Sequence, residues 1–234
     1  MAAGLSFGYD APMDWAPFGV SIQLGLWTTA ILLVTGFPLA WLFVHARGGW
    51  VVWVESLFSL PLVLAPTVLG FYLLVFLSPN GMVGAFFLKT FGVRLAFSFP
   101  GVVIACVVSG LPLMVSTLKT ALALVPNSLV EASFSLGKGR VETLFRVVLP
   151  TMRAGLVTGI VLSFAHCLGE FGVVLMVGGS IPGATKVVSI ALFERVEALD
   201  FASAQAYALV LVLVSYPAVF VLNSLQRQGL RRLR

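Results

Sequence analysis

Few side chains in this sequence have the types and spacing that covalent or metal chemistry requires. The two histidines, His45 and His166, are far apart, and a lone histidine in an apolar helix is more often packed than a ligand. His166 and Cys167 are adjacent and would face different directions on a helix, which disfavours a shared metal site. Cys106 and Cys167 lie in apolar runs and are interpreted as free buried thiols. We therefore predict no catalytic residue and no metal site.

Nucleotide binding is the next chemistry to consider. The sequence contains no G-x-x-x-x-G-K-[ST] motif, since Gly137-Lys138 is followed by Gly139 and lacks the earlier glycine. The chain is therefore not expected to be an enzyme or to hold a cofactor of its own. If ATP drives this protein, the nucleotide must lie on another polypeptide.

Two acidic residues fall in apolar stretches. Glu170 lies about 17 residues, or roughly 25 Å, into a hydrophobic run, where a carboxylate costs a few kcal/mol unless it is paired or hydrated. Two interpretations are open: Glu170 is a gate or a helix-end polar contact in a pathway, or its carboxylate reaches the outer headgroups. Glu55 lies near the end of another run and is interpreted as interfacial.

The composition is that of a membrane protein. Hydrophobic residues make up 59% of the 234 residues and charged residues 10%, against about a quarter charged in soluble domains. The net charge of +5 does not indicate nucleic-acid binding, because the basic residues stand at the ends of hydrophobic runs. The N-terminus has no basic region before its first apolar run, so no cleavable signal peptide is predicted.

The hydrophobic runs predict an all-α membrane protein in one domain, with about five transmembrane helices. Pro38 predicts a kink in the first span. Pro61 and Pro66 must interrupt the hydrogen bonds of the second span, so that neighbouring helices, Ser59 or Thr67 have to satisfy the freed carbonyls. The predicted spans cover about residues 18–44, 51–76, 99–115, 154–177 and 202–222.

The remaining segments connect these spans. A sixth span is the alternative if part of Met82–Phe97 inserts into the membrane. The glycine-rich segment Gly178–Gly183 ends the fourth span, and Ile190–Asp200 predicts a short amphipathic helix.

The distribution of basic residues predicts the orientation. Of the 14 Lys and Arg residues, ten fall on one side of the spans; the other four are Lys89, Arg94, Lys186 and Arg195. The positive-inside rule places the loop of about residues 119–153 and the tail 223–234 in the cytoplasm. Residues 1–17, which contain no Lys or Arg, form a lead segment on the outer side.

The cytoplasmic loop contains the one long interior stretch that is both charged and helix-patterned, Ser128–Pro150. Ser128 and Glu131 have the spacing of a capping box at a helix start, and Gly137 is typical of a helix end. A second helix is predicted to follow and to stop at Pro150. Its apolar face consists of Val141, Leu144, Phe145, Val148 and Leu149.

These residues resemble the EAA loop of the membrane subunits of binding-protein-dependent ABC importers. The matching pattern is Glu131-Ala132-Ser133, then Gly137, then Val147 and Leu149-Pro150. The family pattern usually has Ala at the third position and Ile where this chain has Val147, which are small departures. In that family the loop docks on the ATP-hydrolysing partner; the alternative is a helix pair that covers the ends of the spans with Phe134 and Leu136 packed inward. The coupling residues implied by the resemblance are Glu131, Ala132, Ser133, Phe134, Leu136, Gly137, Phe145, Leu149 and Pro150.

Two later motifs, Leu168-Gly169-Glu170-Phe171-Gly172 and Ile181-Pro182-Gly183, resemble the molybdate permease branch of that family. The resemblance implies a type I ABC importer permease fold in the bacterial inner membrane. It also implies as partners a second copy of the chain, two ATPase subunits holding ATP and Mg, and a periplasmic oxyanion-binding protein. Molybdate is the implied substrate, with tungstate or sulfate/thiosulfate as alternatives; an ATP-independent channel or secondary transporter is the alternative of another class.

An oxyanion pathway without a membrane-embedded Lys or Arg must rely on small polar groups and helix ends, which would hold the ion weakly. Hydroxyls in membrane helices also commonly bond their own backbone. The candidates for the pathway or its gate are Glu170, Phe171, Ser59, Thr67, Ser109, Ser116 and Ser163.

Overall fold

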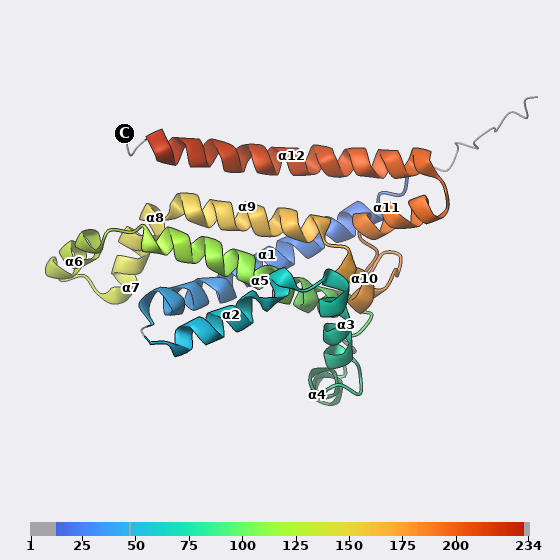
Figure 1. The fold of residues 1–234 in the computed structure, drawn as a ribbon, viewed down its shortest axis with the longest axis horizontal. Helices are drawn as coiled ribbons and strands as arrows, with labels where there is room; N and C mark the ends of the chain where they lie inside the picture. Colours follow the sequence, from blue (N-terminus) through green and yellow to red (C-terminus); the bar gives the residue numbers. More distant parts are fainter. Residues whose placement is uncertain (1–12, 47, 232–234) are drawn as a thin grey trace, which may run out of the picture.

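The computed structural model describes residues 13–46 and 48–231, and the secondary structure of this part is helical (Figure 1). The outer lead segment predicted for residues 1–17 therefore falls mostly outside the described residues. The helices are α1 (Ala16–His45), α2 (Trp50–Val63), α3 (Pro66–Leu77), α4 (Met82–Phe91), α5 (Phe99–Ala123), α6 (Asn127–Ser135), α7 (Arg140–Thr143), the π-helix η1 (Leu144–Val148), α8 (Leu149–Thr151), α9 (Arg153–Gly169), α10 (Gly172–Gly178), α11 (Val188–Glu197) and α12 (Phe201–Arg231).

The core forms where α1, α5 and α9 pack against one another. Met114 of α5 is fully buried between them. A Cβ atom added to Gly36 of α1 or to Gly159 of α9 would lie 2.9 Å from the Met114 side chain. Small residues therefore let the three helices approach closely, as is typical of helix packing in membranes.

Two helices, α1 and α5, are long and apolar enough to cross a membrane without interruption, and two bent pairs could each supply one more span. The predicted second span is one such pair, because α2 and α3 meet at an angle of 110°. Pro66 causes this break: it has no N–H to donate, and it favours the extended conformation found at Ala65 (φ −57°, ψ 134°). The interruption predicted for this span is found at Pro66, whereas Pro61 lies inside α2.

The third and fourth spans also differ from the prediction. Helix α5 continues past Val115 to Ala123, so Lys119 lies in a helix and not in the loop. The fourth span breaks at Glu170 and Phe171, between α9 and α10, before the predicted glycine-rich segment. The N-terminal end of α9 follows α8 after a 73° bend.

Three further helices, α4, α11 and α12, pack around this core. Helix α4, in the segment where a sixth span was the alternative, has 10 residues, fewer than the roughly 20 that a span requires, so it is too short to cross a membrane by itself. Helix α11 is the predicted short amphipathic helix. Helix α12 covers the predicted fifth span and continues to Arg231, into the predicted tail. In Figure 1, α12 runs along α9 on the outside of the bundle.

Candidate functional site

The segment that resembles the EAA loop, α6 to α8, projects from one end of the long helices (Figure 1). We call residues Asn127–Thr151 the coupling segment. The predicted capping box is wrong, because α6 already begins at Asn127 and its N-cap, Pro126, has no side-chain hydrogen bond. Ser128 therefore lies inside the helix.

The predicted end of the first helix is confirmed. Gly137 has φ +77°, a left-handed conformation that residues with a Cβ adopt at a cost. The Gly137 N–H donates to the carbonyl of Phe134 (2.9 Å) and the Lys138 N–H to that of Ser133 (3.2 Å). These bonds satisfy carbonyls at the helix end and fix the bend.

The second half of the coupling segment does not stop at Pro150. Pro150 lies inside α8, and the preceding turn widens into η1, where the Leu149 N–H donates to the carbonyl of Leu144. A proline cannot donate the usual backbone bond and its ring crowds the preceding turn, which favours such a widening. The chain turns instead at Met152 (φ −91°, ψ 12°).

The coupling segment buries polar contacts and exposes apolar side chains. Inside it, the hydroxyls of Ser133 and Thr143 are buried and 2.9 Å apart, which joins α6 to α7. On its surface, Phe134 is 46% exposed, Leu136 78% and Phe145 63%. The alternative in which Phe134 and Leu136 pack inward does not fit this geometry. Exposed apolar side chains beside charged ones are typical of a protein-docking surface.

The predicted coupling residues divide into two sets. Glu131, Ala132 and Pro150 are exposed together with the aromatic and leucine side chains just described. Leu149 packs against the core cluster around Met114, and Ser133 is buried. The second set therefore supports the surface from inside and does not form part of it.

The pathway candidates divide in the same way. Ser109 and Ser163 are 6% and 1% exposed inside the bundle, so neither lines an open path in this structure. Ser59 is partly exposed on α2, and its Oγ donates to the carbonyl of Glu55 (2.9 Å). Thr67 lines a cavity of about 450 Å³ at the junction of the two helix breaks, together with Phe171 and Glu170.

Glu170 occupies the break between α9 and α10 and is 7% exposed. Its Oε1 accepts a hydrogen bond from the Val173 N–H (3.3 Å) at the start of α10, and its Oε2 lies 3.4 Å from Nε2 of His166. Its backbone carbonyl accepts a hydrogen bond from Ser189 Oγ of α11 (2.8 Å). Glu170 is thus a helix-end polar contact, and burial at this site excludes the alternative in which its carboxylate reaches the headgroups.

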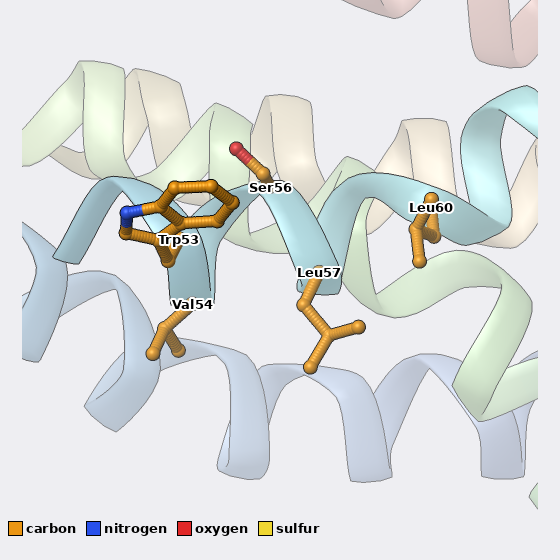
Figure 2. Close-up of a pocket in the computed structure, with 5 residues that line it drawn as sticks. All are labelled: Trp53, Val54, Ser56, Leu57 and Leu60. Atoms are coloured by element: carbon orange, nitrogen blue, oxygen red, sulfur yellow. The ribbon is translucent and has the colours of Figure 1, made fainter. Parts of the chain in front are cut away.

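One polar pair was missed from the sequence. Glu55 of α2 forms an ion pair with Lys119 of α5, 64 positions away. Glu55, Ser56 and Ser59 line a groove on α2. Figure 2, a close-up of a neighbouring pocket on the same helix, shows that Ser56 points away from the side on which Val54 and Leu57 lie. The signal for this pair in the sequence is Lys119, which lies four residues before the end of α5. The pair was not predicted because the third span was expected to end at Val115, which placed Lys119 in the loop.

A second groove, of about 540 Å³, runs between α5 and α9. It is lined by five hydroxyl side chains, those of Ser116, Thr117, Thr120, Thr151 and Thr158. Four of the five hydroxyls donate to their own helix backbone, as predicted for hydroxyls in membrane helices.

Comparison with known proteins decides the family. The family model for the binding-protein-dependent transport system inner membrane component matches residues 25–234. The chain belongs to this family. It is 40% identical over 215 residues to the molybdenum transport system permease protein ModB of Azotobacter vinelandii, which covers 92% of this chain and 95% of that protein. It is 32% identical over 220 residues to the sulfate transport system permease protein CysT of Synechocystis, covering 94% and 77%.

Solved structures of ABC importers share the fold of this permease. The MetNI methionine ABC transporter in an inward-facing conformation matches with a TM-score of 0.68 at 17% identity, covering 93% of this chain and 97% of that chain. A bacterial alginate ABC transporter in complex with a pentasaccharide-bound periplasmic protein matches with a TM-score of 0.67 at 18% identity, covering 91% and 79%. The predicted type I importer permease fold is confirmed.

Proposed function

We propose that this permease is the membrane subunit of an ATP-driven molybdate importer. The main support for this proposal is the coupling segment, which exposes apolar side chains beyond the inner ends of α5 and α9. The chain also belongs to the family of such membrane subunits. Molybdate is favoured because the relative named for molybdenum transport is 40% identical, whereas the one named for sulfate is 32% identical.

The proposed assembly contains two copies of this chain, two ATPase subunits that hold ATP and Mg, and a periplasmic binding protein that delivers the oxyanion. The coupling segment and the C-terminus lie in the cytoplasm and the N-terminus outside, as the basic residues indicate. The binding protein docks at the opposite end of the molecule, on the segment Gly178–Asp200. ATP-driven closure of the ATPases moves the two coupling segments together and opens the cavity outward.

The alternative of another class is an ion-coupled secondary transporter, which is expected to have paired ionisable groups in its membrane helices. The Glu55–Lys119 pair fits that expectation. Family membership and the exposed coupling segment favour the ATP-driven importer. Glu55 and Lys119 therefore need a role inside that mechanism.

The test is ATP hydrolysis by the purified complex in lipid, with the partner ATPase co-expressed. We expect molybdate-loaded binding protein to stimulate hydrolysis more than empty protein, and Glu131→Lys to abolish the stimulation. Tungstate-loaded and sulfate-loaded proteins identify the substrate by the same measurement. Anion flux through the purified chain alone, with no associated ATPase, would overturn the proposal.

A further inference from the structure

Lys119 occupies an unusual place in the fold. Within α1, α2, α3, α5 and α9 it is the only Lys or Arg that does not stand at a helix terminus. Charged groups in membrane helices are costly and generally face a protein interior or a water-filled cavity. The position of Lys119 therefore needs a polar surrounding.

The pair with Glu55 supplies only part of that surrounding. The side chains of Lys119 and Glu55 are 36% and 37% exposed, so the contact is neither sealed in the core nor free in solvent. This pair stays open to a groove of about 340 Å³, to which Glu55, Ser56 and Ser59 contribute.

The hydroxyl-lined groove lies on the other side of Lys119. Successive helix residues are about 100° apart, so Ser116 and Lys119 are about 60° apart around α5. Ser116 and Thr120 are exposed and line the groove between α5 and α9. The partner of Lys119, Glu55, thus lines the first groove, and two polar neighbours of Lys119 on α5, Ser116 and Thr120, line the second.

We propose that Lys119 is an oxyanion-binding residue of the translocation pathway and that Glu55 is the counter-ion that it exchanges for the transported anion. This inference rests on the proposed importer function. An ammonium group donates up to three hydrogen bonds, which suits a tetrahedral dianion, while the neighbouring hydroxyls already donate to their own backbone. When the anion leaves toward the cytoplasm, Glu55 takes its place, which prevents Lys119 from retaining it.

The experiment measures molybdate uptake into liposomes that contain the whole complex, with loaded binding protein outside and ATP inside. We expect Lys119→Gln to lower uptake by at least about tenfold, because hydrogen bonds to charged groups are among the stronger ones. Lys119→Arg should stay within about threefold of the wild type, since it keeps a cation available to the anion. Glu55→Gln removes the counter-ion and should lower uptake by slowing release of the anion, but by less than Lys119→Gln. Lys89→Gln, which removes a lysine from α4, is the matched control and should leave uptake unchanged.

The double variant Lys119→Gln/Glu55→Gln separates the two roles of the pair. If the contact only holds α2 to α5, removing both charges eliminates the unpaired carboxylate and restores uptake, which would overturn the inference. If Lys119 binds the anion, the double variant stays as impaired as Lys119→Gln. Co-purification of the ATPase shows that each variant has folded and assembled.

The wild-type complex separates this inference from the proposed function. If the wild-type complex takes up molybdate and Lys119→Gln does so equally well, the proposed role of Lys119 is rejected while the importer proposal stands. Absence of both stimulated hydrolysis and uptake in the wild type overturns the importer proposal and this inference with it.

Discussion

The molecule bends at two places that are held in different ways. The bend at Gly137, called the inner bend because the proposed orientation places it on the cytoplasmic side, needs only a left-handed glycine and two backbone hydrogen bonds from adjacent residues. The break at Glu170, called the outer break for the same reason, is held by the buried Glu170 carboxylate, which contacts α9 and α10. The backbone carbonyl of Glu170 also accepts a hydrogen bond from α11.

This difference indicates what each bend can transmit. The inner bend sits in a segment that exposes Phe134 and Leu136 just before it, so a partner bound there would contact the bend directly. The outer break joins distant parts of the chain, so a shift of α11 must also move the ends of α9 and α10. Buried polar contacts of this kind rigidify a structure when they are satisfied.

The largest expected effect comes from placing a charge on the coupling surface. Leu136→Asp should reduce co-purification of the ATPase by at least about tenfold, because an apolar interface would have to bury an unpaired carboxylate. Leu199→Asp is the control: Leu199 is an apolar residue with similar exposure, 68% against 78%, at the other end of the molecule. Normal association of the Leu136 variant would show that the exposed inner surface is not the docking site.

The outer break should be sensitive to loss of its carboxylate. Glu170→Ala leaves the Val173 N–H without its acceptor, and we expect the free energy of unfolding to fall by about 1–3 kcal/mol. Glu170→Gln keeps an acceptor oxygen and should lose less. Thermal unfolding of the purified permease in detergent measures both, and equal stabilities of the Ala variant and the wild type would contradict the role assigned to the contact.

The inner bend should be sensitive to backbone conformation and not to space. A Cβ at Gly137 or at Gly139 would have nothing within 4 Å, but only Gly137 has a positive φ. Gly137→Val should therefore strain the bend by about 1–2 kcal/mol and lower the uptake per ATP hydrolysed, while the protein still inserts. Gly139→Val, with φ −72° in the native chain, should behave as the wild type; equal coupling ratios for the two variants would count against the bend.

The smallest expected effect is a pH dependence at the outer end. Partial burial raises the pKa of the Glu194 carboxyl, but hydrogen bonds from Lys186 and Ser180 outweigh it, so the pKa lies below its ordinary value. A lowered pKa means that Glu194 stabilises Gly178–Asp200 above its unfolded pKa and loses this effect as the pH falls through the folded value. Hydrogen-exchange protection of that segment, measured relative to the intrinsic exchange rate at each pH, should decrease on acidification below about pH 4. Hydrogen-exchange protection of the Glu194→Gln variant should depend less on pH. Identical pH profiles of the variant and the wild type would contradict the stabilising role assigned to Glu194.

The sequence by itself determined the features that depend on neighbouring residues. The membrane class follows from composition, the bend at Gly137 from the conformational freedom of glycine, and the short helix α11 from its amphipathic pattern. Short-range patterns are reliable here because the residues that decide the conformation lie within a few positions of one another.

Only the tertiary structure decided which polar groups are buried and which face a groove. Ser109 and Ser163 look like Ser116 in the sequence, yet packing of α1, α5 and α9 covers the first two and leaves Ser116 exposed. The pairing of Glu55 with Lys119 likewise depends on how α2 lies against α5. The physical reason is that burial and ion pairing depend on contacts between helices far apart in the chain, which helical periodicity along one segment does not specify.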